Sequence, residues 1–159
     1  MRARCRTLVL GIGNTLLQDE GAGVHAMRAL EAQAAGRDDI EFMDGGTLSF
    51  TLASAIEDAD QLIVIDAAQL GDAPGATRVF EGAQMDAFVG GNRKRSVHEV
   101  SLVDLLMIAR LADHLPERRA LIGIQPQEIT WGEHPSPAVA AAIPHACAHA
   151  MRLIETWHA

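Results

Sequence analysis

The sequence predicts an α/β protein, a three-layer α/β/α sandwich around a twisted, five-stranded, mostly parallel sheet with one antiparallel edge strand. Short apolar runs alternate with helical segments along the chain, and this alternation is typical of a mostly parallel sheet covered on both faces. The length of 159 residues suits one domain with a sizeable core, so we expect residues 1–159 to form a single domain.

The first half of the chain supplies three predicted strands and two predicted helices. The third strand is apolar throughout, as a central strand should be, and apolar residues of the first helix recur at the spacing of one helical face. Thr47 is the expected cap of the second helix. The predicted strands are residues 7–11, 40–44 and 61–66, and the predicted helices are residues 19–34 and 48–57.

The fourth strand, predicted at residues 77–81, should differ in direction from the others. Ten residues that include Pro74 separate it from the third strand, and this connection is too short for a helical crossover. We therefore expect an antiparallel strand at one edge of the sheet. The fifth strand is predicted at residues 119–124.

Two serines mark the expected starts of the remaining helices. Ser96 should cap a helix over residues 97–112, after a loop at residues 82–95. Ser136 followed by proline should open a last helix that ends near Trp157, after a loop at residues 125–136. Pro144 is expected to kink or interrupt this last helix.

Composition excludes several classes of protein. Lys plus Arg is 13 and Asp plus Glu is 21, so 13 − 21 gives −8, which argues against nucleic acid as a partner. No apolar run is long enough for membrane insertion, and the N-terminus lacks a cleavage pattern, so we expect a cytoplasmic protein. Cys5 and Cys147 are too few for a disulfide scaffold or a four-thiolate zinc site. The apolar content is compatible with a monomer, which we expect.

The turn after the first strand invites comparison with a nucleotide-binding loop. Gly11 and Gly13 begin the dinucleotide fingerprint, but its third glycine is missing. Asp19 and Glu20 would also bring negative charge near a pyrophosphate. A nucleotide-binding module is therefore a weak alternative.

An acidic and imidazole cluster is the stronger candidate site. Glu20 follows the turn of the first strand, Asp66 ends the third strand, and His98 lies in the first turn of a predicted helix. Neighbouring parallel strands would bring the two carboxylates together at one sheet edge, where open α/β sheets build their sites. Two carboxylates and one imidazole suit a borderline divalent metal. The alternative is a capping Glu, a strand-end Asp and a surface His, and spacing alone favours it.

The second strand ends in a turn at the same edge. Its residues form a turn and a helix cap by default, but their backbone amides can also hold a peptide against the site. They are Asp44, Gly45, Gly46 and Thr47.

Two further features leave alternatives open. His145 and His149 are four residues apart on the last helix, as metal ligands can be, but no third ligand is placed with them. Cys147 between them is expected to pack in the core. Trp131, in the loop at residues 125–136, is either an anchor for a partner or folded onto the protein's own surface.

Four motifs in order, taken together, resemble the hydrogenase maturation peptidases. They are LVLGIGNTLLQDEGAGVHAMRAL at residues 8–30, DGGT at residues 44–47, IVIDA at residues 63–67 and SVHEVSLVDLL at residues 96–106. The resemblance extends from the first strand to the last helix. It implies a single peptidase domain that removes a short C-terminal extension from the nickel-loaded large-subunit precursor of nickel–iron hydrogenase.

The resemblance also implies roles for individual residues. Glu20, Asp66 and His98 match the family's metal-binding positions, and either carboxylate is a candidate general base of a metal-dependent, aspartic-type endopeptidase. Asn14, Asp19 and the turn at residues 44–47 match the family pattern and are expected to bind substrate. The nickel should be supplied by the precursor, although another divalent metal can occupy the site in vitro. The rival reading is a nickel-binding maturation chaperone that cleaves nothing.

Overall fold

Five strands form one sheet in the computed structural model, which describes residues 5–46, 50–91 and 101–158. The order is β2-β1-β3-β5-β4, and all neighbours are parallel except β4, which runs antiparallel along β5 at the edge. The predicted fold class and the antiparallel edge strand are confirmed. The strands are β1 (Thr7–Ile12), β2 (Ile40–Gly46), β3 (Gln61–Ala67), β4 (Thr77–Glu81) and β5 (Arg118–Ile124).

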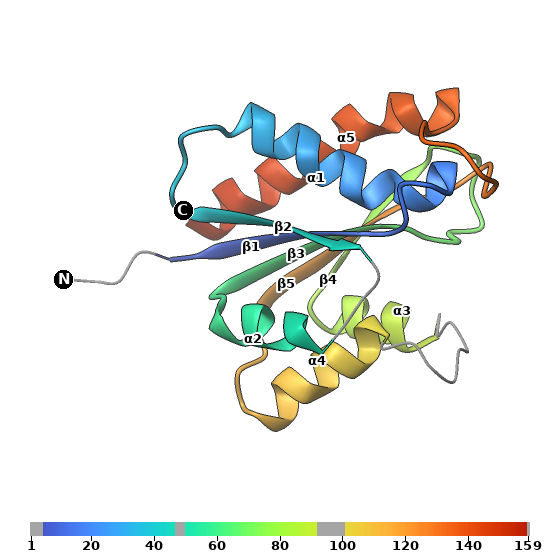
Figure 1. Ribbon diagram of the computed structural model, residues 1–159. Coiled ribbons are helices and arrows are strands. Elements are labelled where there is room, and N and C mark those ends of the chain that lie inside the picture. The colour runs from blue at the N-terminus through green and yellow to red at the C-terminus, as the bar shows by residue number, and fades with distance from the viewer. Residues whose placement is uncertain (1–4, 47–49, 92–100, 159) are drawn as a thin grey trace.

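Helices cover both faces of the sheet, α1 and α5 on one side and α2, α3 and α4 on the other (Figure 1). Among the described residues no helix has the length and apolarity to cross a membrane. The helical elements are η1 (Gln18–Gly21), α1 (Ala22–Gln33), α2 (Thr51–Asp58), α3 (Ala83–Gly91), α4 (Leu102–Leu111) and α5 (Pro137–His158).

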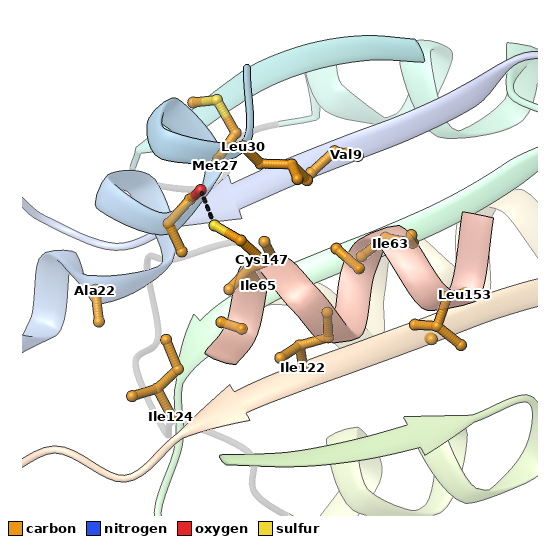
Figure 2. Close-up of a cluster of buried hydrophobic side chains, with 14 of the residues drawn as sticks. Val9, Ala22, Met27, Leu30, Ile63, Ile65, Ile122, Ile124, Cys147 and Leu153 are labelled. Carbon is orange, nitrogen blue, oxygen red and sulfur yellow. Dashed lines mark hydrogen bonds between the residues drawn. The ribbon is translucent and has the colours of Figure 1, made fainter. Parts of the chain in front are cut away.

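Two apolar cores lie on opposite faces of the sheet, because successive side chains of a strand point to opposite sides. In β1, Leu8 and Leu10 join the core under α2 and α4, whereas Val9 joins the core under α1 and α5. Figure 2 shows this second core, in which the Sγ atom of Cys147 donates a 3.5 Å hydrogen bond to the carbonyl oxygen of Ala26. The expected core position of Cys147 is confirmed, and burial raises the pKa of its thiol.

Helix α3 contradicts the prediction of a loop over residues 82–95, since its residues Ala83–Gly91 are helical. Met85 and Val89, four residues apart, are buried against the core of this face. Glycines at its C-terminal end and a short apolar stripe hid the helix in the sequence. Residues 92–95 lie outside the described part of the chain.

Helix α4 begins later than predicted, because its cap is Ser101. The Ser101 hydroxyl accepts from the Asp104 amide and the Asp104 carboxylate accepts from the Ser101 amide, which forms a capping box. Ser96, the predicted cap, lies outside the described residues. Helix α2 likewise begins only at Thr51, and its predicted cap Thr47 is also outside them.

Helix α5 begins at Pro137, as predicted, and runs without interruption through Pro144 to His158. The predicted interruption is therefore wrong, whereas the alternative of a kink at Pro144 stays a prediction. The first predicted helix is divided in two: the acidic segment at residues 18–21 is a separate 3-10 turn, and α1 follows it. This division decides where the acidic side chains point.

Candidate functional site

The candidate site lies at the edge of the sheet where β1, β2 and β3 end. Strand β1 leads into a turn, η1 and the first turn of α1, while Asp66 is the next-to-last residue of β3. The register pairs Gly11 with Ile65, which places Asp66 level with the end of β1. Since η1 also contacts β3, the structure brings Glu20 and Asp66 to the same edge.

Close packing of glycine backbones holds η1 and α1 against these strand ends. A Cβ atom on Gly23 would lie 2.0 Å from the carbonyl oxygen of Ile65 and 2.5 Å from that of Ile12, so no larger residue fits. Gly13 has a φ of 130°, and a Cβ there would lie 1.8 Å from the carbonyl oxygen of Glu20. The backbone of Glu20 is thereby held directly on the turn of β1.

Asp66 sits where the sheet opens toward the site. It is half-buried, and its Oδ1 atom is buried. Its partner on β5 is Gly123, and a Cβ atom there would lie 3.1 Å from Leu70 and 3.2 Å from Ala68, so the segment after β3 packs over this neighbour. Two half-buried acidic residues, Asp66 and Glu20, therefore lie at one edge of the sheet, and carboxylate oxygens can ligate a divalent cation or accept a proton from water.

The turn that ends β2 is tied to the same edge. Gly45 is the extra residue of a β-bulge, because Gly11 pairs with Asp44 and the next residue of β1 pairs with Gly46. The Gly46 carbonyl accepts a 3.2 Å hydrogen bond from the Gly13 amide. Thr47, the last residue of the predicted turn, lies outside the described residues.

The carboxylate of Asp44 is exposed and shapes this turn. Its Oδ1 accepts a hydrogen bond from the Gly46 amide at 2.8 Å, and its Oδ2 pairs with Arg28 of α1 at 3.1 Å. The amide of Gly46, one of the groups expected to hold a peptide, is therefore already used within the turn. The contribution of Arg28 was not foreseen from the sequence.

Asn14 shapes the turn that follows β1. Its Oδ1 accepts from the Leu16 amide at 2.9 Å, and its carbonyl oxygen accepts from the Leu17 amide at 3.1 Å. This is an Asx turn, in which the side chain of asparagine stabilises the local backbone. A substrate contact by Asn14 stays a prediction.

Asp19 is placed differently from its neighbour Glu20. It is fully buried, and its carboxylate accepts hydrogen bonds from the amides of Gln127 (2.8 Å) and Glu128 (2.8 Å) and from both the amide (2.6 Å) and the hydroxyl (2.8 Å) of Ser136. Four hydrogen bonds thus hold this carboxylate inside the protein, and a substrate contact by Asp19 stays a prediction. Asp19 positions the segment between β5 and α5.

The pKa of Asp19 reflects this environment. Burial alone raises the pKa of a carboxyl group, but the hydrogen bonds from Glu128, Ser136 and Gln127 together hold the pKa of Asp19 below its ordinary value. Asp19 thus remains a buried anion, and its charge stabilises the donors around it. Ser136 donates its hydroxyl to this anion, a use that its position before Pro137 did not reveal.

The loop at residues 125–136 is confirmed and is joined to the turn of β1. The Gln18 amide donates to the Gly132 carbonyl at 2.9 Å, and the Gly132 amide donates to the Leu16 carbonyl at 2.9 Å. Trp131 is 79% exposed, so the alternative in which it folds onto the protein's own surface is wrong. The loop therefore presents an aromatic side chain to solvent beside the site.

His98 lies outside the described residues, so the three-residue metal set is not tested by the structure. Among the residues that are described, no three His, Cys, Asp or Glu side chains are grouped to hold a metal. His149 lies with its Nε2 atom 3.1 Å from the Thr77 hydroxyl, and Cys147 is buried in the core. The described residues thus give no third ligand to the histidine pair on α5.

Comparisons with known proteins agree on one family. The family described as "Hydrogenase maturation protease" matches residues 24–153. The hydrogenase expression/formation protein HupD of Rhizobium leguminosarum is 38% identical over 153 residues, which cover 96% of this chain and 75% of that protein. The hydrogenase 2 maturation protease of Escherichia coli is 34% identical over 139 residues, which cover 87% of this chain and 84% of that protein.

A solved structure extends the agreement to the fold. The hydrogenase maturating endopeptidase HybD from Escherichia coli superposes with a TM-score of 0.86 at 32% identity, covering 95% of this chain and 93% of that one. The maturation protease HybD from Thermococcus kodakarensis superposes with a TM-score of 0.75 at 29% identity, covering 93% of this chain and 98% of that one.

Proposed function

Because this chain belongs to the hydrogenase maturation protease family, we propose that it removes the C-terminal extension from the nickel-loaded large-subunit precursor of nickel–iron hydrogenase. Family membership makes the chain a protease. The observation that supports the proposed site is the position of Glu20 and Asp66 at one sheet edge, where Gly13 and Gly23 let backbones approach closely. These two carboxylates are also the ones that the sequence resemblance predicts, and their position at one edge supports the proposal.

In this proposal the nickel ion is part of the substrate. Glu20, Asp66 and His98 would recognise it, since carboxylate oxygens and an imidazole nitrogen form a donor set that suits a borderline divalent metal. Only a loaded precursor then completes the site, so cleavage depends on nickel. Another divalent ion can occupy the same donors in vitro.

The chemistry assigned to the chain's own residues is general base catalysis. Asp66 or Glu20 accepts a proton from a water molecule while the oxygen of that water attacks the carbonyl carbon of the scissile bond. The departing amine takes up a proton. The substrate's metal supplies Lewis-acid polarisation at the same place. A protease with an aspartic-type site of this kind needs no serine or cysteine nucleophile.

The turn at residues 44–47 and Asn14 form the proposed wall for the peptide. The exposed Asp44 carboxylate and the half-buried Asn14 border the edge on which Glu20 and Asp66 lie. We assign the reaction to a monomer in the cytoplasm.

The test is incubation of the purified protein with nickel-loaded and nickel-free precursor, followed by intact mass measurement. Loss of a C-terminal peptide from the loaded precursor alone is expected. Asp66→Asn should abolish the cleavage, whereas the exposed Asp58→Asn on α2, a matched change away from the site, should leave it intact. If the purified protein binds nickel but cleaves neither precursor, it would instead be a maturation chaperone.

A further inference from the structure

Three exposed apolar side chains lie on two joined segments beside the candidate site. Leu16 is 50% exposed, Ile129 is 48% exposed and Trp131 is 79% exposed. Leu16 belongs to the turn after β1, whereas Ile129 and Trp131 belong to the loop between β5 and α5. The two segments are joined by the hydrogen bond from the Gly132 amide to the Leu16 carbonyl. We call these three residues the apolar ridge.

The backbone under the apolar ridge is held in place from inside. The buried Asp19 carboxylate binds the amides of Gln127, Glu128 and Ser136, which bracket Ile129 and Trp131 on both sides. The Thr130 hydroxyl also donates to the Gln18 side chain at 3.1 Å. A fixed loop that presents large apolar groups to water is typical of a binding surface, because water disfavours such exposure and partner contact relieves it.

The apolar ridge adjoins the proposed catalytic edge. The Glu20 amide donates to the Leu17 carbonyl at 3.1 Å, so Glu20 and Leu16 belong to one compact turn. In Figure 1 the orange segment between β5 and α5 lies at the same end of the sheet as the blue turn after β1. A polypeptide that reaches Glu20 and Asp66 can therefore contact the apolar ridge at the same time.

The chain segments that carry the apolar ridge are acidic. The sequence has no Lys or Arg in residues 7–27 or in residues 120–151, the two stretches that carry the apolar ridge. The loop adds Glu128 and Glu133, and both are exposed. An apolar segment that carries basic side chains complements this surface, whereas an acidic segment is repelled.

We propose that the apolar ridge is the docking surface for a segment of the hydrogenase large-subunit precursor that is apolar and flanked by basic side chains. This inference rests on the proposed function and adds the chemistry that selects the substrate. Trp131 is its central anchor, because a large exposed aromatic side chain on a fixed backbone gains most from burial at an interface. Glu128 and Glu133 contribute the charged rim.

The test compares Trp131→Ala with Leu111→Ala, a matched loss of an apolar side chain that is 86% exposed and lies at the C-terminal end of α4. Both variants should unfold at the wild-type urea concentration, because neither side chain is buried. Trp131→Ala should raise the Kd for the loaded precursor, measured by calorimetry, and the KM for cleavage about tenfold or more, with kcat unchanged. Leu111→Ala should change neither constant.

Salt dependence tests the charged rim separately. The wild-type Kd should increase with ionic strength, and the Glu128→Gln/Glu133→Gln double variant should bind more weakly and with less salt dependence. Unchanged Kd and KM in Trp131→Ala would overturn the inference while leaving the proposed function intact. Precursor that binds in a Trp131-dependent way but is never cleaved would instead overturn the proposed function and support the docking surface.

Discussion

Asp19→Asn is the most demanding test of how the site is built, because it changes one atom of a buried carboxylate. Oδ2 of Asp19 accepts from the Gln127 amide, the Glu128 amide and the Ser136 hydroxyl, and Oδ1 accepts from the Ser136 amide. An asparagine has the same shape, but its amide nitrogen cannot accept a hydrogen bond. In either orientation of the new side chain, at least one donor of the loop faces another donor.

The expected loss follows from the number and kind of these bonds. A hydrogen bond to a charged group contributes about 1.5–3 kcal/mol and a neutral one about 0.5–1.5 kcal/mol. Gln127 and Glu128 are exposed residues, so their amides can form hydrogen bonds with water instead. Ser136 is only 8% exposed, so its donors lack this replacement. We therefore expect Asp19→Asn to lower the free energy of unfolding by about 2–4 kcal/mol, measured by urea denaturation at pH 7.

A matched control is Asp44→Asn, which changes an exposed carboxylate at the same edge. Asp44 accepts one backbone amide, and its ion pair with Arg28 is exposed on both sides, so its loss should be below about 1 kcal/mol. Hydrogen exchange of residues 125–136 should accelerate in Asp19→Asn and remain as in wild type in Asp44→Asn. Equal stabilities of the two variants would refute the positioning role of Asp19.

The difference in stability between wild type and Asp19→Asn should depend on pH in a defined direction. The pKa of Asp19 is lower in the folded protein than its ordinary value, so the anion stabilises the fold at every pH above the unfolded pKa of about 3.9. This contribution is lost as the pH falls through the folded pKa, whereas asparagine does not titrate. The stability gap between wild type and Asp19→Asn should therefore be full at pH 7 and narrow below about pH 4. A gap that widens in acid would contradict the assignment of a buried anion.

Two further predictions concern packing and charge. Gly23→Ala places a Cβ atom 2.0 Å from a backbone oxygen at the end of β3, so it should lower the free energy of unfolding, measured by urea denaturation, by about 1–3 kcal/mol. The control is Gly90→Ala in α3, whose Cβ meets nothing within 4 Å and which should be neutral or stabilising. Equal changes in the two variants would contradict the close backbone approach at Gly23. Asp86→Ala removes the partner of Arg119, which is 12% exposed and bonded to Asp86 at 2.9 and 2.5 Å, and should cost about 2 kcal/mol. A loss below about 0.5 kcal/mol would show that solvent already screens this pair.

Sequence patterns predicted the sheet better than the helix boundaries, for a physical reason. Strands of a covered parallel sheet are continuous apolar runs, and the short connection before β4 forced an antiparallel edge. The start of α4 was mistaken because Ser96 and Ser101 are both possible caps in the sequence, and Ser101 forms the capping box with Asp104 at the start of α4. Helix α3 was missed because only Met85 and Val89 form its buried stripe.

The candidate site was predicted in part, and the missing part depended on contacts between distant segments. The pairing of β1 with β3 was predicted correctly from topology, and this pairing puts Glu20 and Asp66 at one edge. The role of Asp19 could not be read from its surroundings in the sequence, since its partners lie more than a hundred residues away. The glycines at residues 21 and 23 were an available signal, because glycine inside a predicted helix often marks a close backbone approach.

The adjacent residues Asp19 and Glu20 have different roles, a structural one for Asp19 and a proposed catalytic one for Glu20, because of the short turn that carries both. In a 3-10 helix successive side chains point about 120° apart, so adjacent residues of η1 cannot face the same surroundings. One carboxylate turns into the protein and binds the loop that carries Trp131, and the other remains half-buried on the edge with Asp66. The position of the proposed docking surface relative to the proposed general base is therefore set by four residues, Gln18–Gly21. Substitutions that unwind this turn should impair precursor binding and cleavage together, even where both Glu20 and Trp131 are retained.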